Sequence, residues 1–343
     1  MLKRDQKLSI YMEGALGQDA GKMGYGILRY SPNAVSCVID TEHAGRSLQS
    51  VISSPRECPI VGSVEEAVAL GAEVFVLGIA PPGGLIPQSW YDTIDLAVSS
   101  GLSVVNGLHD LLAPRYREMQ AGQWVWDVRV EPPGLQPGTG QARHLGNRRV
   151  LMIGTDMAVG KMTAGLEIYR AAKERGVAAE FVATGQIGIT VTGAGVPLDA
   201  VRLDFASGSI ESEVMRVKDA DLIIVEGQGA LIHPGSSANL PLLRGSCPTH
   251  LILCHRAGQE TLRRIPEVPI PDLLRYTELY EDLAEACGSF PRPKTVAIAL
   301  NTAHLSDEEA EIWRERIQKE TGLPTADPVR HGPERLLDAL STA

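Results

Sequence analysis

The residues best suited to chemistry lie in one glycine-rich segment, GTDMAVGKMT, at Gly154–Thr163. An apolar run precedes the segment and an amphipathic run follows it, so a strand should lead in and a helix should lead out. Gly154 and Gly160 permit a tight turn with inward-pointing N–H groups, and Lys161 adds a cation at the positive end of the helix. This spacing is typical of a P-loop that holds the phosphates of a nucleotide or a nucleotide-like cofactor. The residues expected to contact that ligand are Gly154, Thr155, Asp156, Val159, Gly160, Lys161, Met162 and Thr163.

The candidate metal ligands are Glu226, Asp204 and Thr163. The hydroxyl that usually ligates magnesium follows the P-loop lysine directly, but here Met162 stands in that place and the hydroxyl comes at Thr163. This shift weakens the case for magnesium and leaves phosphate binding intact. Glu226 ends the apolar run of DLIIVEGQG, where a P-loop protein positions magnesium or its water. Asp204 is either a second carboxylate, for a metal or an amine, or the N-cap of a helix.

Other polar side chains also end apolar runs. Thr184 and Gln186, in ATGQIG, are suited to hydrogen-bond an anionic or amide group of a substrate. His233 follows the Glu226 segment and is our preferred general base, although a lone histidine at a strand end is more often structural. The predicted catalytic residues are therefore His233, Glu226 and Lys161. Asn301 ends the run VAIALN, where an amide can bind adenine.

The first 130 residues carry further candidates. IDTEHAG ends a predicted strand with Asp40, Glu42 and His43, and GLHD adds His109. We expect these loops to face the P-loop across a cleft and to form the acceptor pocket with His43 and His109, although loop structure alone would also explain their glycines and prolines. The first loop lacks a clean GxGxxG, which disfavours NAD. Its segment GQDAGKMGYGILRY is either a second anion-binding loop centred on Lys22 or a chance likeness to the P-loop.

Short apolar runs alternate with amphipathic segments along the whole chain, which indicates an α/β protein with mostly parallel strands. We predict a Rossmann-like parallel sheet in residues 1–130, a linker rich in proline and glycine at 131–147, and a doubly wound P-loop domain at 148–343. The expected strands are Leu8–Met12, Ala34–Ile39, Val74–Leu77, Ser103–Val105, Arg148–Ile153, Ala179–Ala183, Leu222–Val225, Leu251–Cys254 and Val296–Leu300. The expected helices are Val64–Ala69, Trp90–Ser99, Lys161–Arg175 and Asp307–Glu320, with Ser63 and Ser306 as N-caps.

Composition narrows the class of protein. The net charge of −10 argues against a nucleic-acid partner, because phosphate contacts need a basic face. No apolar run approaches the roughly 20 residues of a membrane span, and the N-terminus lacks a signal-peptide core. The five cysteines show no CxxC spacing, so we expect free, buried thiols in a cytoplasmic protein that takes a small-molecule substrate. A homo-oligomer is compatible with the composition, which does not specify an interface.

Two family resemblances rest on these motifs. GTDMAVGKMT, VEGQG and IALN resemble dethiobiotin synthetase and its relatives, P-loop enzymes that use ATP on carboxylates or amines. A closer resemblance covers nearly the whole chain through IDTEHAG, GIAPPGG, GLHD, GTDMAVGKMT, FVATGQ, VEGQGALIHP and LILCH. These motifs are similar to those of a bacterial and archaeal family of two-domain proteins, with a Rossmann-like domain followed by a P-loop domain. Its described members act as D-glutamate N-acetyltransferases.

The closer resemblance implies acetyl transfer from acetyl-CoA to the amine of an amino acid, since a P-loop can hold the ADP portion of CoA as well as ATP. Such a transfer needs a base, here His233 or Glu226, and donors for the carbonyl oxyanion, here the N–H groups of Gly227–Gly229. Arg202, Arg244 or Arg256 would bind the substrate carboxylate. Two alternatives stay open: an ATP-dependent ligase or kinase with Mg²⁺, and a non-catalytic nucleotide sensor.

Overall fold

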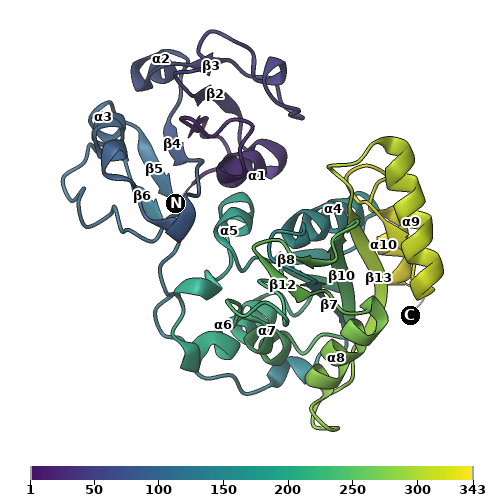
Figure 1. Cartoon of the computed structure of the whole chain (residues 1–343). Helices are drawn as coiled ribbons and strands as arrows, with labels where there is room; N and C mark the ends of the chain where they lie inside the picture. Colours follow the sequence, from purple (N-terminus) through teal and green to yellow (C-terminus); the bar gives the residue numbers. More distant parts are fainter. Residues whose placement is uncertain (1, 342–343) are drawn as a thin grey trace. The chain divides into compact units, whose positions relative to one another are not determined.

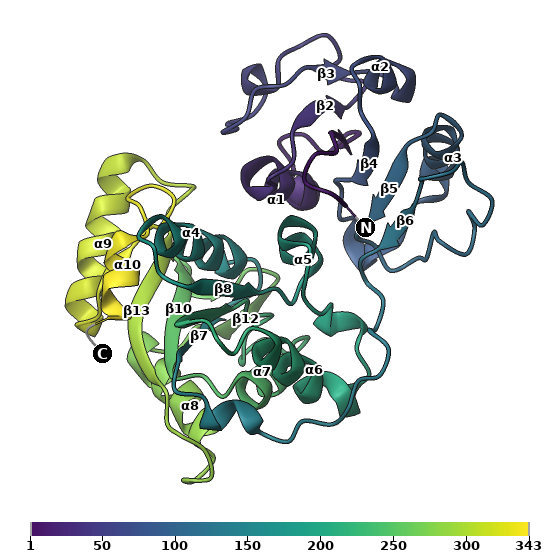
Figure 2. The same ribbon diagram turned by 180° about the vertical axis from the view of Figure 1, so that it is seen from behind.

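The computed structural model of the protein describes residues 2–341. The described chain divides into two compact units. The first unit comprises the residues up to Val130 together with Gln186–Ala200, and the second comprises Glu131–Gly185 together with Val201 onwards. Figures 1 and 2 show the chain from opposite sides. No helix within residues 2–341 is both long enough and apolar enough to cross a lipid bilayer.

Within residues 2–341, the first unit contains a six-stranded sheet with the strand order β3-β2-β1-β4-β5-β6. All its neighbouring strands pair in parallel. This order, with the crossover between β1 and β4, is that of a Rossmann fold. The strands are β1 (Leu8–Tyr11), β2 (Val35–Ile39), β3 (Ile60–Val61), β4 (Val74–Leu77), β5 (Ser103–Asn106) and β6 (Val125–Asp127).

Helices cover both faces of this sheet. On one face α2 packs on β2 and α3 packs on β5, and on the other α1 contacts β4 and α5. The close approach of α1 and α5 depends on Gly26, where an added Cβ would lie 2.3 Å from Ile187 Cγ2. The helices are α1 (Lys22–Tyr30), α2 (Val64–Ala69), α3 (Tyr91–Ser99) and α5 (Gln186–Thr192).

The second unit has a second six-stranded parallel sheet in the described chain, with the order β14-β13-β10-β7-β9-β8. Most of its strand residues are fully buried, as expected for a sheet covered on both faces. The strands are β7 (Arg148–Gly154), β8 (Ala179–Val182), β9 (Leu222–Val225), β10 (His250–Arg256), β13 (Lys294–Asn301) and β14 (Thr325–Ala326). A separate antiparallel hairpin consists of β11 (Thr261–Leu262) and β12 (Ile265–Pro269).

Two helical layers enclose this sheet (Figure 1). One layer holds α4, α9 and α10, with α4 packed on β7, β8 and β9, and the other holds α6, α7 and α8. The helices are α4 (Lys161–Glu174), α6 (Leu203–Arg216), α7 (Asn239–Ser246), α8 (Leu273–Glu285), α9 (Asp307–Thr321) and α10 (Glu334–Ala339). Because these strands are parallel, the carboxyl ends of β7, β9, β10 and β13 lie at the same edge of the sheet.

The predicted fold class, two α/β domains with parallel sheets, is confirmed. Local signals also hold: Ser63 accepts the Glu66 N–H at the start of α2, and Ser306 forms a capping box with Glu309 at the start of α9. Residues 131–147, expected to be a linker, belong to the second unit, where Thr139 N–H donates to the buried Glu211 carboxylate at 2.6 Å.

Candidate phosphate-binding site

The loop between β7 and α4 has the backbone shape that its glycines predict. Gly160 lies at the N-cap of α4 with φ 107°, a conformation that favours glycine, and Ala158 also has a positive φ of 55°. An added Cβ on Gly154 would lie 2.8 Å from Lys161 Nζ. A side chain at this position would therefore displace the Lys161 ammonium from where it lies.

Lys161 begins α4 and is only 7% exposed. Its ammonium donates to the Asp156 carbonyl oxygen at 2.9 Å, which holds the charge inside the loop. Burial lowers the pKa of Lys161 to about 8, while the nearby Cys254, Asp156 and Glu226 act in the opposite direction. The loop thus presents a buried cation and a helix N-terminus at one point, an arrangement that attracts phosphate.

The Asp156 carboxylate ties the loop to the β11–β12 hairpin. One carboxylate oxygen accepts the Met157 N–H at 2.6 Å. The other accepts the Gln259 side-chain amide at 2.6 Å and the Arg263 N–H at 2.9 Å. With three donors on a side chain that is 3% exposed, Asp156 fixes the loop, and its charge is fully satisfied by protein groups.

The neighbouring strand β10 supports the loop from one side. Thr155 N–H donates to the Cys254 carbonyl oxygen at 3.1 Å, and Thr155 Oγ1 lies 3.0 Å from His255 Nδ1. Burial lowers the pKa of His255 to about 4, so this imidazole is neutral at physiological pH. We assign both residues to the support of the loop.

Two tyrosines of α8 join the P-loop to the segment after β9. Tyr276 hydroxyl donates to the Gly154 carbonyl oxygen at 3.1 Å, and Tyr280 hydroxyl donates to Asn239 Oδ1 at 2.8 Å. Both hydroxyls accept the Leu231 N–H, at 3.0 and 3.2 Å. The rings pack edge to face with centroids 5.2 Å apart, and burial raises the pKa of both phenols. Sequence reasoning missed this pair, because its partners lie far away along the chain.

Glu226 and Thr184 come together at the ends of β9 and β8. Glu226 Oε2 accepts the N–H groups of Thr184 and Gly185 at 2.9 and 3.1 Å, and Thr184 Oγ1 donates back to the Glu226 carbonyl oxygen at 2.8 Å. Gln228 Nε2 donates to Thr184 Oγ1 at 3.1 Å. The carboxylate is 4% exposed, and its charge acts on Lys161.

His233 lies in the turn between β9 and α7, half-buried. The Gly235 N–H donates to its Nδ1 at 3.1 Å. In a neutral ring the proton must then sit on Nε2, so His233 presents a donor. This geometry suits hydrogen bonding to an oxygen or thiolate better than the general-base role expected from sequence. An added Cβ on Gly235 would lie 3.9 Å from Met157 Cε, which places this turn beside the P-loop.

The remaining predicted ligands of this unit differ in position. Asn301 ends β13, and its amide donates to the Val159 carbonyl oxygen at 3.3 Å, beside the loop. Met162 and Thr163 lie half-buried in the first turn of α4.

Asp204 is exposed in the first turn of α6, whose N-cap is Arg202, so Asp204 is not the N-cap. Within residues 2–341, no three His, Cys, Asp or Glu side chains are grouped to hold a metal ion.

The three arginines considered for a substrate carboxylate have different surroundings. Arg202 pairs with Glu131 at 2.6 Å, and Arg244 donates to the carbonyl oxygens of Leu283 and Ala284 at the end of α8. Arg256 ends β10, at the same sheet edge as the P-loop. Of the three, Arg256 is thus the candidate with the most suitable position.

The predicted substrate residues His43, His109 and Gln186 belong to the first unit. His43 Nδ1 lies 2.5 Å from the Asp40 carboxylate. His109 Nε2 accepts from Arg129 at 2.6 Å. Gln186 begins α5, and an added Cβ on Gly107 would lie 3.3 Å from its Cγ.

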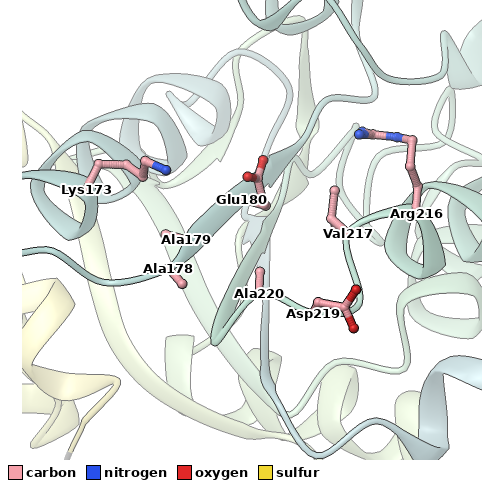
Figure 3. A pocket seen from close by; sticks show the side chains of 8 residues that line it. All are labelled: Lys173, Ala178, Ala179, Glu180, Arg216, Val217, Asp219 and Ala220. Carbon is pink, nitrogen blue, oxygen red and sulfur yellow. The ribbon is translucent and has the colours of Figure 1, made fainter.

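A surface hollow of about 440 Å³ lies elsewhere on the second unit (Figure 3). Its charged lining is Lys173, Glu180, Arg216 and Asp219. These residues lie at the amino ends of β8 and β9, whereas the P-loop lies at the carboxyl ends of the parallel strands. The hollow is therefore separate from the phosphate-binding loop.

Fold and site together define a two-domain α/β protein with a Rossmann-like sheet and a P-loop. Two family models match the chain, both described as domains of unknown function: a Rossmann-like domain over residues 41–131 and a P-loop domain over residues 136–337. The chain belongs to this family, DUF1611. The closer of the two family resemblances, to two-domain proteins with a Rossmann-like and a P-loop domain, is thereby confirmed.

Solved and curated relatives extend over most of the chain. The crystal structure of a DUF1611 family protein from Anabaena variabilis is 47% identical, with a TM-score of 0.95 over 99% of this chain and 100% of that one. A relative from Tritonibacter scottomollicae, named D-glutamate N-acetyltransferase, is 38% identical over 81% of this chain and 84% of its own. A relative from a Pseudoalteromonas species has the same name and is 35% identical over 80% of this chain and 83% of its own.

Proposed function

We propose that this protein is an N-acetyltransferase that moves the acetyl group of acetyl-CoA to the amine of D-glutamate or a similar D-amino acid. The observation that carries the proposal is the P-loop with its buried Lys161, in a chain whose relatives of 35–38% identity bear the name of this activity. The cytoplasm, where acetyl-CoA is available, is the compartment that this activity requires.

The loop has the features that the diphosphate of CoA needs. Lys161 supplies a cation that is held in place by the Asp156 carbonyl oxygen, and α4 directs its N-terminal N–H groups to the same point. Gly154 and Gly160 keep the backbone free of side chains on that side. We assign adenine binding to Asn301, whose amide donates to the Val159 carbonyl oxygen of the loop. An ADP moiety of either CoA or ATP satisfies these contacts.

The groups around the β9 end are suited to the acyl side of the reaction. His233 carries its proton on Nε2 and can donate to the thioester carbonyl or to the departing sulfur. The N–H groups of Gly227–Gly229 are the further donors that we assign to the developing oxyanion. Glu226 holds the Thr184 and Gly185 N–H groups, so we assign it to positioning this loop.

An ATP-dependent ligase or kinase is the second candidate. The observation that favours it is Glu226, a buried carboxylate at the end of β9 whose charge acts on Lys161. In such an enzyme Glu226 would hold Mg²⁺ or its water, and Thr163 would be the nearest hydroxyl of the P-loop helix. Glu226 Oε2 accepts the N–H groups of Thr184 and Gly185, so in this role the carboxylate would have to bind the metal while it keeps that loop in place.

The two candidates differ in their products. Purified protein is incubated with acetyl-CoA and D-glutamate, with L-glutamate as a parallel acceptor, and the released thiol and N-acetylated product are followed. A second set replaces acetyl-CoA with Mg-ATP and measures ADP and phosphate. Thiol release that needs the D-amino acid supports the transferase. Nucleotide cleavage without thiol release refutes the transferase and supports the ligase or kinase.

A further inference from the structure

Strand β10 lies between the P-loop strand β7 and strand β13 in the sheet of the second unit (Figure 1). Arg256 is the last residue of β10 and pairs in register with Asn301, the last residue of β13. Two residues earlier, Cys254 pairs with Gly154, where the P-loop begins. Because neighbouring strands are about 4.8 Å apart, the end of β10 places Arg256 between the P-loop and Asn301.

The Arg256 side chain lies on the same face of the sheet as the P-loop lysine. Side chains alternate between the two faces of a strand, so Arg256 shares a face with Cys254 and with its register partner Asn301. Gly154, the register partner of Cys254, would carry a Cβ only 2.8 Å from Lys161 Nζ, which identifies this face. The Asn301 amide also contacts the P-loop from this face.

Arg256 is half-buried and has no anionic partner in the described part of the chain. Among residues 2–341, no hydrogen bond or ion pair joins its guanidinium to another group. His304, whose Nε2 donates to the Ala257 carbonyl oxygen at 3.1 Å, is near it: burial lowers the pKa of His304, and the charge of Arg256 lowers it further. Glu309, a carboxylate that acts on His304, is engaged with Ser306 in the capping box of α9. An arginine in such surroundings is suited to bind an anion from outside the chain.

The course of a bound CoA past these residues follows from the assignments already made. The P-loop is assigned to the diphosphate and Asn301 to the adenine, and the ribose joins these two groups. The ribose of a CoA bound in this way therefore lies at the end of β10. CoA carries a phosphate on the 3′ oxygen of this ribose, and ATP does not.

We propose that Arg256 binds the 3′-phosphate of CoA and makes the site selective for CoA over nucleotides that lack this phosphate. The inference rests on the proposed binding of acetyl-CoA at the P-loop. The planar guanidinium offers two parallel N–H groups to two phosphate oxygens, a geometry that an ammonium group does not provide. Arg256 is thus a specificity-determining residue.

The test is titration calorimetry of the full chain with CoA and with 3′-dephospho-CoA, which differ only in this phosphate. Wild type should bind CoA on the order of 10–100-fold more tightly, as expected for a charge-assisted pair. Arg256→Gln should bind both ligands equally, and dephospho-CoA as tightly as wild type does. Arg256→Lys keeps the charge without the fork and should retain part of the preference.

Arg216→Gln is the matched control. It removes the same charge from the end of α6, where Arg216 pairs with Glu213 at 2.8 Å, and it should keep the wild-type preference. The preference is a ratio of two affinities measured on the same protein sample. A lower fraction of folded protein in a variant therefore does not change it.

The outcomes separate this inference from the proposed function. Equal affinity of the wild type for CoA and dephospho-CoA overturns the role of Arg256 and leaves CoA binding at the P-loop intact. A wild type that binds neither ligand overturns the proposed acetyl transfer and this inference with it. An equal loss of affinity for both ligands in Arg256→Gln overturns the inference in favour of a structural role. An unchanged preference with a raised KM for the acceptor overturns it in favour of a substrate carboxylate.

Discussion

The ammonium of Lys161 lies 2.9 Å from the backbone carbonyl oxygen of Asp156, five residues earlier in the same loop. Lys161 therefore stabilises the conformation of the same loop in which its ammonium is available to a phosphate. Because Asp156 in turn anchors the β11–β12 hairpin, one chain of contacts runs from the cation to a hairpin more than 100 residues away.

The affinity for acetyl-CoA should depend on the protonation of Lys161. Burial lowers its pKa to about 8 in the free protein, and a bound phosphate raises that pKa again. Below pH 8 the lysine is charged before binding and affinity is constant. Above pH 8 binding must take up a proton, so affinity should fall by up to about tenfold per pH unit. Titration calorimetry from pH 7 to pH 9.5 measures this, and Lys161→Met should bind weakly at every pH. A wild-type affinity that is unchanged up to pH 9.5 contradicts it.

Asp156→Asn should weaken both the fold and the site. The variant replaces a buried acceptor of three N–H groups with an amide that faces at least one of those donors. We expect a loss of about 1–3 kcal/mol in the free energy of unfolding, measured by chemical denaturation. Loss of the Asp156 charge should also move the pH at which acetyl-CoA affinity falls to a lower value. Asp204→Asn is the exposed control and should stay within about 0.5 kcal/mol of wild type.

The tyrosine pair of α8 should show coupled losses. Tyr276→Phe removes the hydroxyl that donates to the Gly154 carbonyl oxygen, and Tyr280→Phe removes the hydroxyl that donates to Asn239 Oδ1. Either change should cost about 1–3 kcal/mol of unfolding free energy. The double variant should cost about 1 kcal/mol more than the sum, because only then does the Leu231 N–H lose both acceptors. Additive losses in a double-mutant cycle would show that the two hydroxyls do not act together on the Leu231 N–H.

Arg149 should be essential for the stability of the second unit. It is 1% exposed in β7, and its guanidinium donates to the carbonyl oxygens of Leu145, Asn147, Ser246 and Cys247. Burial lowers the pKa of Arg149, and the carbonyl oxygens that accept from its guanidinium compensate for the buried charge. A lysine cannot reach acceptors on both sides, so Arg149→Lys should lose about 3 kcal/mol or more in chemical denaturation. Arg148→Lys, next in sequence and only half-buried, is the control, and an equal loss there refutes this role.

The features that could be predicted from the sequence are those that depend on residues close together in the chain. The P-loop, the strands around it and the caps at Ser63 and Ser306 are set by residues that are neighbours in the chain, so pattern and structure agree. The tyrosines of α8 and the Gln259 amide are not visible in this way, because their partners in the loop lie more than 100 residues away. Only the packed fold brings them together.

The segment after β8 also differs from expectation, for a physical reason. Gln186 was expected in a loop that follows β8, but the chain forms α5 from this residue and packs it on α1 in the first unit. The absence of a side chain at Gly26 makes room for Ile187 in that contact, and no local periodicity predicts it. The hydrogen bonds of His233 and His43 could not be predicted either. They depend on the turn at Gly235 and on the position of Asp40, neither of which the sequence specifies.

Whether the P-loop binds acetyl-CoA is tested by isothermal titration calorimetry of the full chain with acetyl-CoA and, separately, with Mg-ATP, repeated on Lys161→Ala. We predict that acetyl-CoA binds to the wild type and that the substitution abolishes this binding, because the buried lysine and the helix N-terminus hold the diphosphate. Binding of Mg-ATP alone, or acetyl-CoA binding that is unaffected by Lys161→Ala, would contradict it.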